Sequence, residues 1–336
     1  MKRLLVNALL LILSTTICLI VLEQGYRVYL FGGASFSVEK VDSVSGIGVS
    51  GLIKPSNNSE IIYELKPNLD TYFKLVEFRT NSHGLRDQEY SYSKPENTIR
   101  VAVIGDSFTM PAGVAIEDAF HSLLEERFTK RSQQTTYQFI NFGVGGYNLR
   151  QYLATLKSRA SAYDPDLIII GFCPANDHEV PLESIFSQPY QVKPKVSPFY
   201  KSFVLSKIRS LTKARQDKES RPIFDAEQQS YINATLSEMS AYGVRRNVPV
   251  VITYLSHQFD QTYANALEKL ALDNGLLFAN VSAPFAGVDV RDYKIYPTDS
   301  HPNKEAHRLF ANELFTYLSP LLQQGDQAIE TEQSGQ

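Results

Sequence analysis

The sequence predicts an α/β fold in three layers, in which helices cover both faces of a five-stranded parallel sheet. Short runs of β-branched and apolar residues alternate with segments of helical periodicity through the central part of the chain. The run at 166–172 is apolar at nearly every position, as expected for a strand buried on both faces. A long apolar segment at the amino terminus predicts one transmembrane helix before this domain.

The elements of the sheet domain can be assigned in order. Strands are expected at 100–104, 137–141, 166–172, 248–254 and 276–281. Helices are expected after the first strand, after the second strand, near 224, over 263–273 and after 303. Three of them have apolar residues that recur on one helical face. These residues are Phe120, Leu123, Leu124 and Phe128 after the first strand; Leu149, Tyr152, Leu153 and Leu156 after the second; and Leu309, Phe310, Leu314, Tyr317 and Leu318 in the last helix. This alternation predicts a site at the carboxyl ends of the strands.

The amino terminus has the pattern of a membrane anchor. Lys2 and Arg3 precede an apolar run of 19 residues, 4–22, which as a helix spans about 28 Å, close to one bilayer. A cleaved secretory signal is the alternative, but its apolar stretch is shorter and the nearest small-residue pair, Gly32 and Ala34, lies far beyond the run. We expect residues 1–31 to be an uncleaved anchor with a cytoplasmic amino terminus and an extracytoplasmic body, periplasmic in a bacterium.

Composition divides the remaining chain. Residues 32–59 hold five Gly and seven Ser and are expected to be a linker, 60–322 the folded domain, and 323–336 a disordered tail. An insertion at 181–221 carries nine Lys and Arg against three Asp and Glu. Its apolar residues recur at helical spacing, so it is expected to lie on an anionic membrane surface, to cover the site and meet an anionic glycan or lipid head group, or to be a solvated helix.

Charge and cysteine content exclude several classes of protein. The 33 Lys and Arg against 36 Asp and Glu give a net charge of −3, so no overall charge favours nucleic acid as a partner. The only cysteines are Cys18, inside the apolar run, and Cys173. A disulfide framework or a thiolate metal site is therefore excluded.

Residues that carry chemistry follow four of the predicted strands. Ser107 follows the first strand, Gly146 lies in the glycine-rich turn after the second, Asn176 follows the third, and His301 stands after the fifth with Asp299 beside it. Each alone has an ordinary explanation as a turn or helix cap. Together, a serine, a histidine with an acidic neighbour and separate hydrogen-bond donors are the groups needed for acyl transfer.

The glycine-rich turn also has to be weighed as a dinucleotide-binding loop. Counted from Gly143, a G-x-G-x-x-G pattern would place Asn148 at its last glycine, and no suitable acidic residue follows the next strand. A nucleotide site is therefore disfavoured.

In their order and positions, the blocks around Ser107, Gly146, Asn176 and His301 resemble those of the SGNH (GDSL) hydrolase superfamily, over about residues 98–320. The resemblance implies a flavodoxin-like fold, Ser107 as nucleophile and His301 as general base. It also implies an oxyanion hole made by the N–H groups of Ser107 and Gly146 and the side chain of Asn176. No metal or organic cofactor is implied.

Two features adjust the resemblance. Asn81-Ser82-His83-Gly84-Leu85-Arg86-Asp87 is similar to a lead-in found in membrane-anchored bacterial members, and Pro174 stands where a glycine is usual. The family usually has its acid three residues before the histidine, where this chain has Thr298; Asp299 is two before, as in polysaccharide O-acetyltransferase relatives. Asp299 is expected either to orient His301 or to cap the following helix while a backbone carbonyl holds the imidazole.

These features favour a membrane-anchored, extracytoplasmic serine esterase acting on acetyl or other short acyl esters. Two alternatives remain open at this stage: an O-acetyltransferase acting on a cell-envelope or exported polysaccharide, and a non-catalytic glycan-binding or assembly component. The expected partners are an acyl ester, carried by a small molecule, polysaccharide or lipid, and the membrane.

Overall fold

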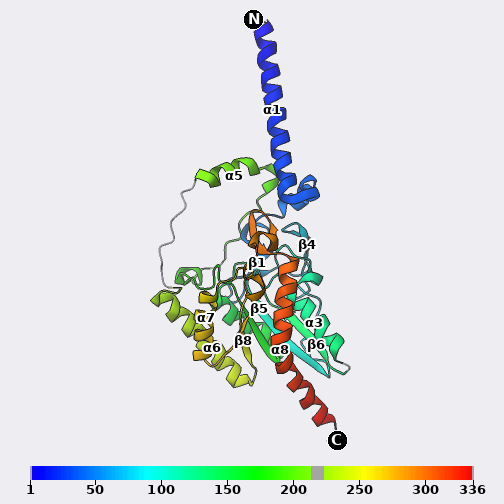
Figure 1. The fold of residues 1–336 in the computed structure, drawn as a ribbon, viewed down its shortest axis with the longest axis vertical. Coiled ribbons are helices and arrows are strands. Elements are labelled where there is room, and N and C mark those ends of the chain that lie inside the picture. Colours follow the sequence, from blue (N-terminus) through cyan, green and yellow to red (C-terminus); the bar gives the residue numbers. More distant parts are fainter. Residues whose placement is uncertain (1, 133, 189, 213–222, 335–336) are drawn as a thin grey trace.

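A five-stranded parallel sheet forms the centre of the molecule (Figure 1). The computed structural model describes residues 2–132, 134–188, 190–212 and 223–334. The strands are β5 (Thr98–Gly105), β6 (Thr136–Asn141), β7 (Leu167–Phe172), β8 (Val250–Tyr254) and β9 (Leu277–Asn280). They lie in the order β6-β5-β7-β8-β9, and every neighbouring pair is parallel. The predicted sheet is confirmed. The chain passes from β5 to β6 on one side of β5 and then adds β7, β8 and β9 on the other side. A ligand site is expected at the carboxyl end of the strand where the order reverses in this way.

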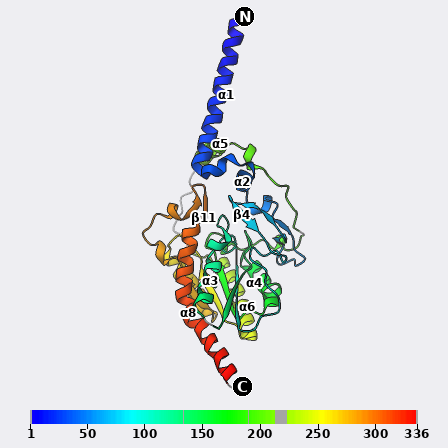
Figure 2. The same ribbon diagram turned by 90° about the vertical axis from the view of Figure 1, so that its right-hand side faces the viewer.

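Two layers of helices cover this sheet, as predicted (Figure 2). One face carries α3 (Phe120–Arg131) and α8 (Lys304–Ser334), and the other carries α4 (Leu149–Ser158), α6 (Ala226–Arg246) and α7 (Gln261–Asp273). Side chains alternate along each strand, so Ile104 belongs to the core under α4 and Val103 to the core under α3. The two cores explain why the strands are apolar at almost every position.

Local capping fixes where several of these helices begin. The Asn148 side chain accepts a hydrogen bond from Gln151 N, and the Gln151 side chain accepts one from Asn148 N. These two bonds form a capping box for α4. Asp225 and Gln228 form the same arrangement at the start of α6. The turn that precedes α4 is thereby held, and this turn contains the glycine-rich segment.

The amino-terminal helix α1 (Lys2–Phe31) stands out from the body (Figure 1). None of the residues in its most apolar window is buried. Among the described residues it is the one helix that is long and apolar enough to cross a membrane, a property that a signal sequence shares. Its last turn differs, because Arg27, Leu30 and Phe31 are buried against the body.

Residues 32–59 are structured, although their composition predicts a linker. They contain two short 3₁₀ helices (Gly32–Phe36 and Ile47–Val49), α2 (Val38–Asp42) and β1 (Ile53–Pro55). Val41, Leu52 and Ile53 are buried. Glycine and serine dominate the count, but these few apolar side chains reach the body, and their burial orders the segment.

Three small antiparallel sheets accompany the main one. The strand β1 pairs with β2 (Tyr63–Leu65), β3 (Asp70–Phe73) pairs with β4 (Val76–Arg79), and β10 (Lys294–Tyr296) pairs with β11 (Asp299–Pro302). Further 3₁₀ turns lie at Ile116–Asp118, Ala160–Tyr163, Glu183–Ile185, Pro198–Tyr200, Ala283–Phe285 and Val290–Tyr293. The hairpins lie at the end of the body from which α1 emerges (Figures 1 and 2).

The basic insertion and the carboxy terminus differ in part from expectation. The insertion contains one helix longer than a single turn among its described residues, α5 (Phe203–Thr212), and residues 213–222 lie outside the described part. The segment expected to be a disordered tail continues α8 as far as Ser334, and residues 335 and 336 lie outside the described part. Gln, Glu and Ala are good helix formers, so the backbone extends the helix without an apolar stripe of its own.

Candidate active site

The candidate nucleophile lies directly after β5, an inner strand of the sheet. Ser107 follows Gly105 and Asp106, and its Oγ is 2.8 Å from Nε2 of His301. The buried carboxylate of Asp106 accepts a hydrogen bond from Phe108 N at 2.8 Å, which closes the turn around the serine. Burial raises the pKa of Asp106 above its ordinary value. Its contact with the serine hydroxyl is long, at 3.5 Å, so the short bond of Ser107 is the one to His301.

The histidine is held from its other side by a carboxylate. His301 and Asp299 both belong to β11, and His301 Nδ1 forms a short hydrogen bond to Asp299 Oδ1, which also accepts from His301 N at 3.1 Å. The helix α8 is capped by Asn303, whose Oδ1 accepts from Ala306 N at 3.1 Å. Asp299 therefore contacts the imidazole, two residues before it, and a different side chain caps the helix.

A lysine far away in the sequence shares this carboxylate. Lys74, in the turn between β3 and β4, places its Nζ 2.5 Å from Asp299 Oδ2, and both side chains are 10 % exposed. Tyr296 OH donates to the same oxygen at 3.1 Å. Burial raises the pKa of Asp299, but the hydrogen bond and charge of His301 and the charge of Lys74 outweigh it, so this pKa lies well below its ordinary value. Asp299 is thus ionised and has partners on both oxygens.

The sequence gives no signal for Lys74. The contact joins residues 225 positions apart, and a lone lysine in a short turn has no motif around it. The turn itself is unusual, because Lys74 and Leu75 both have positive φ, at 52° and 74°. Leucine and lysine adopt this conformation only at a cost, so surrounding contacts must hold the turn in place. Such a conformation is visible only in the structure.

Two of the three candidate oxyanion donors, Gly146 and Asn176, lie on neighbouring loops. Gly146 has a φ of +80°, and a Cβ at this position would lie 2.9 Å from Tyr63 OH. Only glycine takes this conformation freely and leaves room for the tyrosine, whose hydroxyl donates to Gly145 O at 2.9 Å. Asn176 Nδ2 donates to Tyr147 O at 2.9 Å. The amide side chain therefore lies against the glycine-rich turn.

A buried carboxylate fixes the loop that carries Asn176. Asp177 accepts hydrogen bonds from Tyr152 OH at 2.8 and 2.9 Å and from Cys173 N at 2.7 Å. Burial raises the pKa of Asp177 well above its ordinary value. These bonds tie the loop to α4 below it, and Pro174, which replaces the usual glycine, lies within the span they close.

The segment 81–87 braces the loops around Ser107. The buried guanidinium of Arg86 donates to Met110 O at 2.8 Å, Pro111 O at 2.5 Å and Val114 O at 2.7 Å, in the loop that follows the serine. Asp87 Oδ2 accepts from Asn141 N at 2.8 Å, at the end of β6. The segment 81–87, which the sequence shows only as a resemblance, therefore supports the loop after Ser107 and the end of β6, where the glycine-rich turn begins.

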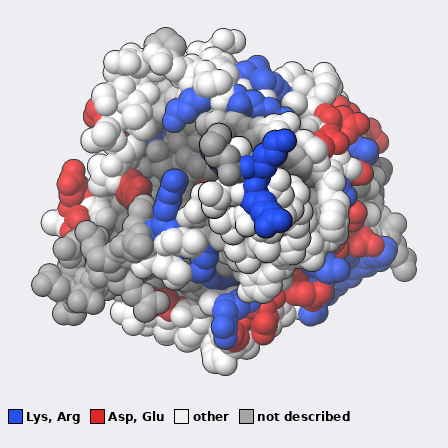
Figure 3. Space-filling model, turned by 90° about the horizontal axis from the view of Figure 1, so that it is seen from above, with Lys and Arg blue, Asp and Glu red and all other residues white. Residues whose placement is uncertain are grey.

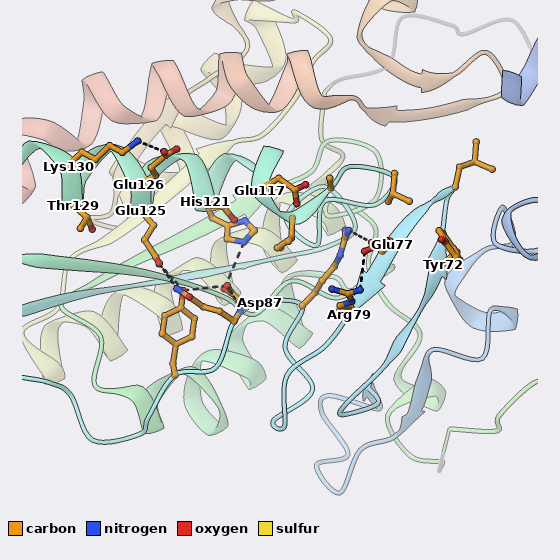
Figure 4. Close-up of a pocket in the computed structure, with 18 of the residues that line it drawn as sticks. Tyr72, Glu77, Arg79, Asp87, Glu117, His121, Glu125, Glu126, Thr129 and Lys130 are labelled. Atoms are coloured by element: carbon orange, nitrogen blue, oxygen red, sulfur yellow. Dashed lines mark hydrogen bonds and ion pairs between the residues drawn. The ribbon is translucent and has the colours of Figure 1, made fainter. Parts of the chain in front are cut away.

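A separate cavity of about 1090 Å³ lies between the β3–β4 hairpin and α3 (Figure 4). Its lining includes Glu77, Arg79, Asp87, His121 and Glu125, and none of the candidate catalytic or oxyanion residues. Burial raises the pKa of Asp87 to about 8 and lowers the pKa of His121 to about 3. Both groups are therefore mainly neutral near pH 7, which limits the charge in this polar interior.

Three comparisons relate the chain to known proteins. The sequence matches the model of the GDSL-like Lipase/Acylhydrolase family over residues 103–309. No protein with a curated description gives a significant match.

Similar solved structures include TesA (14 % identity, 66 % of this chain and 99 % of that one, TM-score 0.44), the acetyl xylan esterase AlAXEase (16 %, 66 % and 100 %, 0.41) and the psychrotrophic esterase EstA from Pseudoalteromonas sp. (15 %, 68 % and 100 %, 0.42). Values this low carry no conclusion about activity or substrate.

The family match spans more than half of the chain and begins inside β5, so it contains the end of that strand, the other four strands of the sheet and all four blocks at the strand ends. The serine at the end of β5, the parallel sheet and this match agree with one another. The chain belongs to the GDSL-like lipase/acylhydrolase family of the SGNH hydrolase superfamily, whose members are hydrolases that act on ester bonds.

Proposed function

We propose that the protein is a membrane-anchored serine esterase that removes acetyl or other short acyl groups through an acyl-enzyme, with its catalytic domain outside the cytoplasm. The observation that carries the proposal is the continuous set of hydrogen bonds from Ser107 Oγ through His301 to Asp299. A serine hydroxyl is a weak nucleophile unless a base takes its proton. The 2.8 Å contact lies within the range required for such a transfer.

In the first step, Ser107 Oγ attacks the ester carbonyl while its proton passes to His301 Nε2. The carboxylate of Asp299 accepts a hydrogen bond from the Nδ1–H group of His301, which keeps Nε2 free to act as the base and stabilises the imidazolium that forms. The carbonyl oxygen gains negative charge, and the N–H groups of Ser107 and Gly146 with the Asn176 amide would bind it. His301 then gives its proton to the alcohol oxygen, which leaves.

In the second step, water attacks the acyl-serine. His301 Nε2 takes a proton from the water, the oxyanion forms again in the same place, and the carboxylic acid leaves as the proton returns to Ser107 Oγ. The side chains used in the two steps are the same. No redox change occurs. His301 passes the proton of Ser107 to the leaving alcohol in the first step and a proton of the water to Ser107 in the second, so the enzyme ends as it began.

The proposed location rests on the amino-terminal helix. The apolar surface of α1 is exposed, and burying it in a bilayer would remove it from water. Lys2 and Arg3 at its start favour a cytoplasmic amino terminus, so the body would lie on the other side.

Hydrolysis of a p-nitrophenyl ester series tests the activity and the acyl preference. The full chain in detergent should release p-nitrophenol fastest from the acetate, and the Ser107→Ala variant should lose this activity. A matched control is Ser237→Ala, which removes an exposed hydroxyl on α6 and should leave the rate unchanged.

A fluorophosphonate probe provides a second measurement. It should label the parent protein at Ser107, and mass spectrometry of the labelled peptide identifies the residue. Activity retained in Ser107→Ala, or labelling at another serine, would contradict the proposed nucleophile. Labelling of Ser107 without release of p-nitrophenol from any ester would contradict hydrolysis and favour transfer to another acceptor.

A further inference from the structure

The helix α5 has apolar side chains with no partner in the body. Leu205, Ile208 and Leu211 are 54 %, 52 % and 71 % exposed. They are three residues apart and share one side of the helix. Exposed large apolar side chains that line up in this way usually mark a contact surface. The position of α5 on the molecule indicates what it contacts.

Polar contacts fasten the start of α5 to α1. The carboxylate of Glu23 accepts hydrogen bonds from Phe203 N at 2.9 Å, Val204 N at 3.2 Å and Ser202 Oγ at 2.7 Å. Arg27 pairs with Glu23 and donates to Lys201 O at 3.0 Å. Glu23 therefore caps α5, and the helix begins at the height of α1 where Glu23 lies.

The position of Glu23 on α1 coincides with the end of the apolar run. Glu23 is the first charged residue after the segment 4–22. If this segment spans the membrane, Glu23 lies at the outer interface. From there α5 extends sideways, across the direction of α1 (Figure 1). A helix that has an exposed apolar side and starts at the membrane interface would lie along the membrane surface.

The apolar side of α5 points away from the body. The ring of Phe203 packs edge-on against Phe31, 5.1 Å between centroids, and Phe31 is two turns further toward the body than Glu23. At about 100° per residue, Leu205, Ile208 and Leu211 lie roughly 160°, 140° and 80° around the helix from Phe203. The side that carries Leu205 and Ile208 therefore faces the membrane end of the molecule, and Leu211 lies at its edge.

The charge around the foot of α1 suits an anionic surface. Lys201 and Lys207 are exposed beside the apolar side chains. A view down α1 shows Lys and Arg side chains close around it (Figure 3). Basic residues next to an inserted apolar side are attracted by anionic head groups.

We propose that α5 lies flat on the outer surface of the membrane that α1 spans, with Leu205, Ile208 and Leu211 inserted among the lipids. This inference rests on the proposed anchor. It adds a second membrane contact, which would stop the body from rotating freely about α1. The foot of α1 also packs on the active-site hairpin, with Phe31 and Tyr296 5.3 Å apart between centroids. The two contacts would together hold the candidate active site on the membrane side of the body.

Single-tryptophan fluorescence tests the proposal, because the natural chain has no tryptophan. The full-length Ile208→Trp variant is reconstituted in nanodiscs of phosphatidylcholine and anionic phosphatidylglycerol, with or without lipids brominated at defined depths. Its emission should be quenched, most strongly by bromine near the head-group end of the acyl chain, since interfacial helices insert about 5–10 Å. Leu211→Trp repeats the test at a second exposed position.

Two further variants separate the possible outcomes. Leu11→Trp, inside α1, should be quenched most strongly by bromine near the chain ends, and Val244→Trp, 79 % exposed on α6, should not be quenched. Quenching of Leu11→Trp without that of Ile208→Trp and Leu211→Trp would overturn the role of α5 and leave the anchor standing. No quenching of Leu11→Trp would overturn the anchor and this inference together. Quenching of Val244→Trp would overturn the orientation of the body.

Discussion

Replacing Lys74 by methionine tests whether the cation behind Asp299 sets the pH range of the esterase. The Asp299 carboxylate divides its negative charge between this ammonium, 2.5 Å from Oδ2, and His301 on the other oxygen. Methionine keeps an apolar stem of similar length and removes the charge. In the Lys74→Met variant, the carboxylate would act on His301 alone, and the imidazolium form of the ring would become more stable.

The size of the effect follows from the spacing of the groups. The carboxylate bridges the ammonium and the ring, so Nζ lies roughly 6 Å from the imidazole, and Coulomb's law with an effective dielectric constant of about 20 gives about 2.8 kcal/mol. One pH unit corresponds to about 1.4 kcal/mol. The His301 side chain is 23 % exposed, and water weakens the interaction there. We expect the acid limb of the kcat/KM profile to move to higher pH by about one to two units.

The assay is kcat/KM for p-nitrophenyl acetate across the pH range in which histidine titrates. At the acid end, the Lys74→Met variant should be about ten- to a hundredfold slower than the parent, and the two should converge on the alkaline plateau. Lys157→Met is a matched control, because Lys157 also pairs with a carboxylate, Glu238, but on the exposed surface. Its profile should coincide with that of the parent. Thermal unfolding of each variant measures the stability lost with each ion pair.

A folded Lys74→Met protein whose acid limb coincides with that of the parent would refute the electrostatic role of Lys74. The Lys74→Arg variant adds an independent check, because it restores the positive charge and should return the acid limb toward its original pH. If methionine prevents folding, Lys74→Gln keeps a hydrogen-bond donor at this position and removes the charge, so the same comparison applies.

Three further predictions concern the supporting structure. Gly146→Ala should lower kcat by about tenfold or more, because alanine opposes the φ of +80° and its Cβ meets Tyr63 OH, whereas Gly287→Ala, with φ +74° and open space, should keep the parent's kcat. Arg86→Met should lower the free energy of unfolding by about 3 kcal/mol or more, since three loop carbonyls lose their donor; a loss below about 1 kcal/mol in denaturant titration would contradict this. Burial lowers the pKa of His121 in the folded protein to about 3, so as the pH falls below about 6.5 the unfolded chain binds a proton that the folded protein does not. Between about pH 7 and 5, the free energy of unfolding of the parent should therefore fall by about 2 kcal/mol more than that of His121→Leu. Equal pH dependence in the two proteins would show that His121 is not kept neutral.

The sheet domain could be predicted from the sequence because its signals are local. Each strand is a short apolar run followed by a helix with an apolar stripe, and the five strands lie within two residues of the expected bounds. The linker expectation at 32–59 differs from the structure for the opposite reason. Three buried side chains order that segment, and a residue count dominated by glycine and serine does not weigh them.

The residues of the candidate site also divide into those with a local sequence signal and those placed only by tertiary contacts. The sequence names Ser107, His301 and Asp299, since each follows a recognisable strand, and in the structure hydrogen bonds join the three. It leaves open whether Asp299 contacts the imidazole or the helix, because both arrangements suit an aspartate two residues before the histidine. Lys74 could not be inferred at all, because its contact depends on how a hairpin folds back over the domain.

The contacts of the candidate active site extend well outside the part of the chain that matches the family. The match begins at residue 103, yet Lys74 pairs with Asp299, and Arg86 holds the loop after Ser107. Phe31, at the end of α1, packs on Tyr296, whose hydroxyl donates to Asp299.

The segment before residue 103 is therefore part of the structure around the candidate site, because it supplies direct or indirect contacts to the loop that carries Ser107 and to the Asp299 carboxylate. Removing α1 would take Phe31 away from Tyr296 and expose the apolar surface of the body that Leu30 and Phe31 cover, so a truncated body is expected to have a weakened site. Activity and its pH dependence are therefore to be measured on the full chain in detergent. A truncation that removes residues 1–31 and still matches the full chain in kcat/KM and in its acid limb would show that α1 and the candidate site are independent.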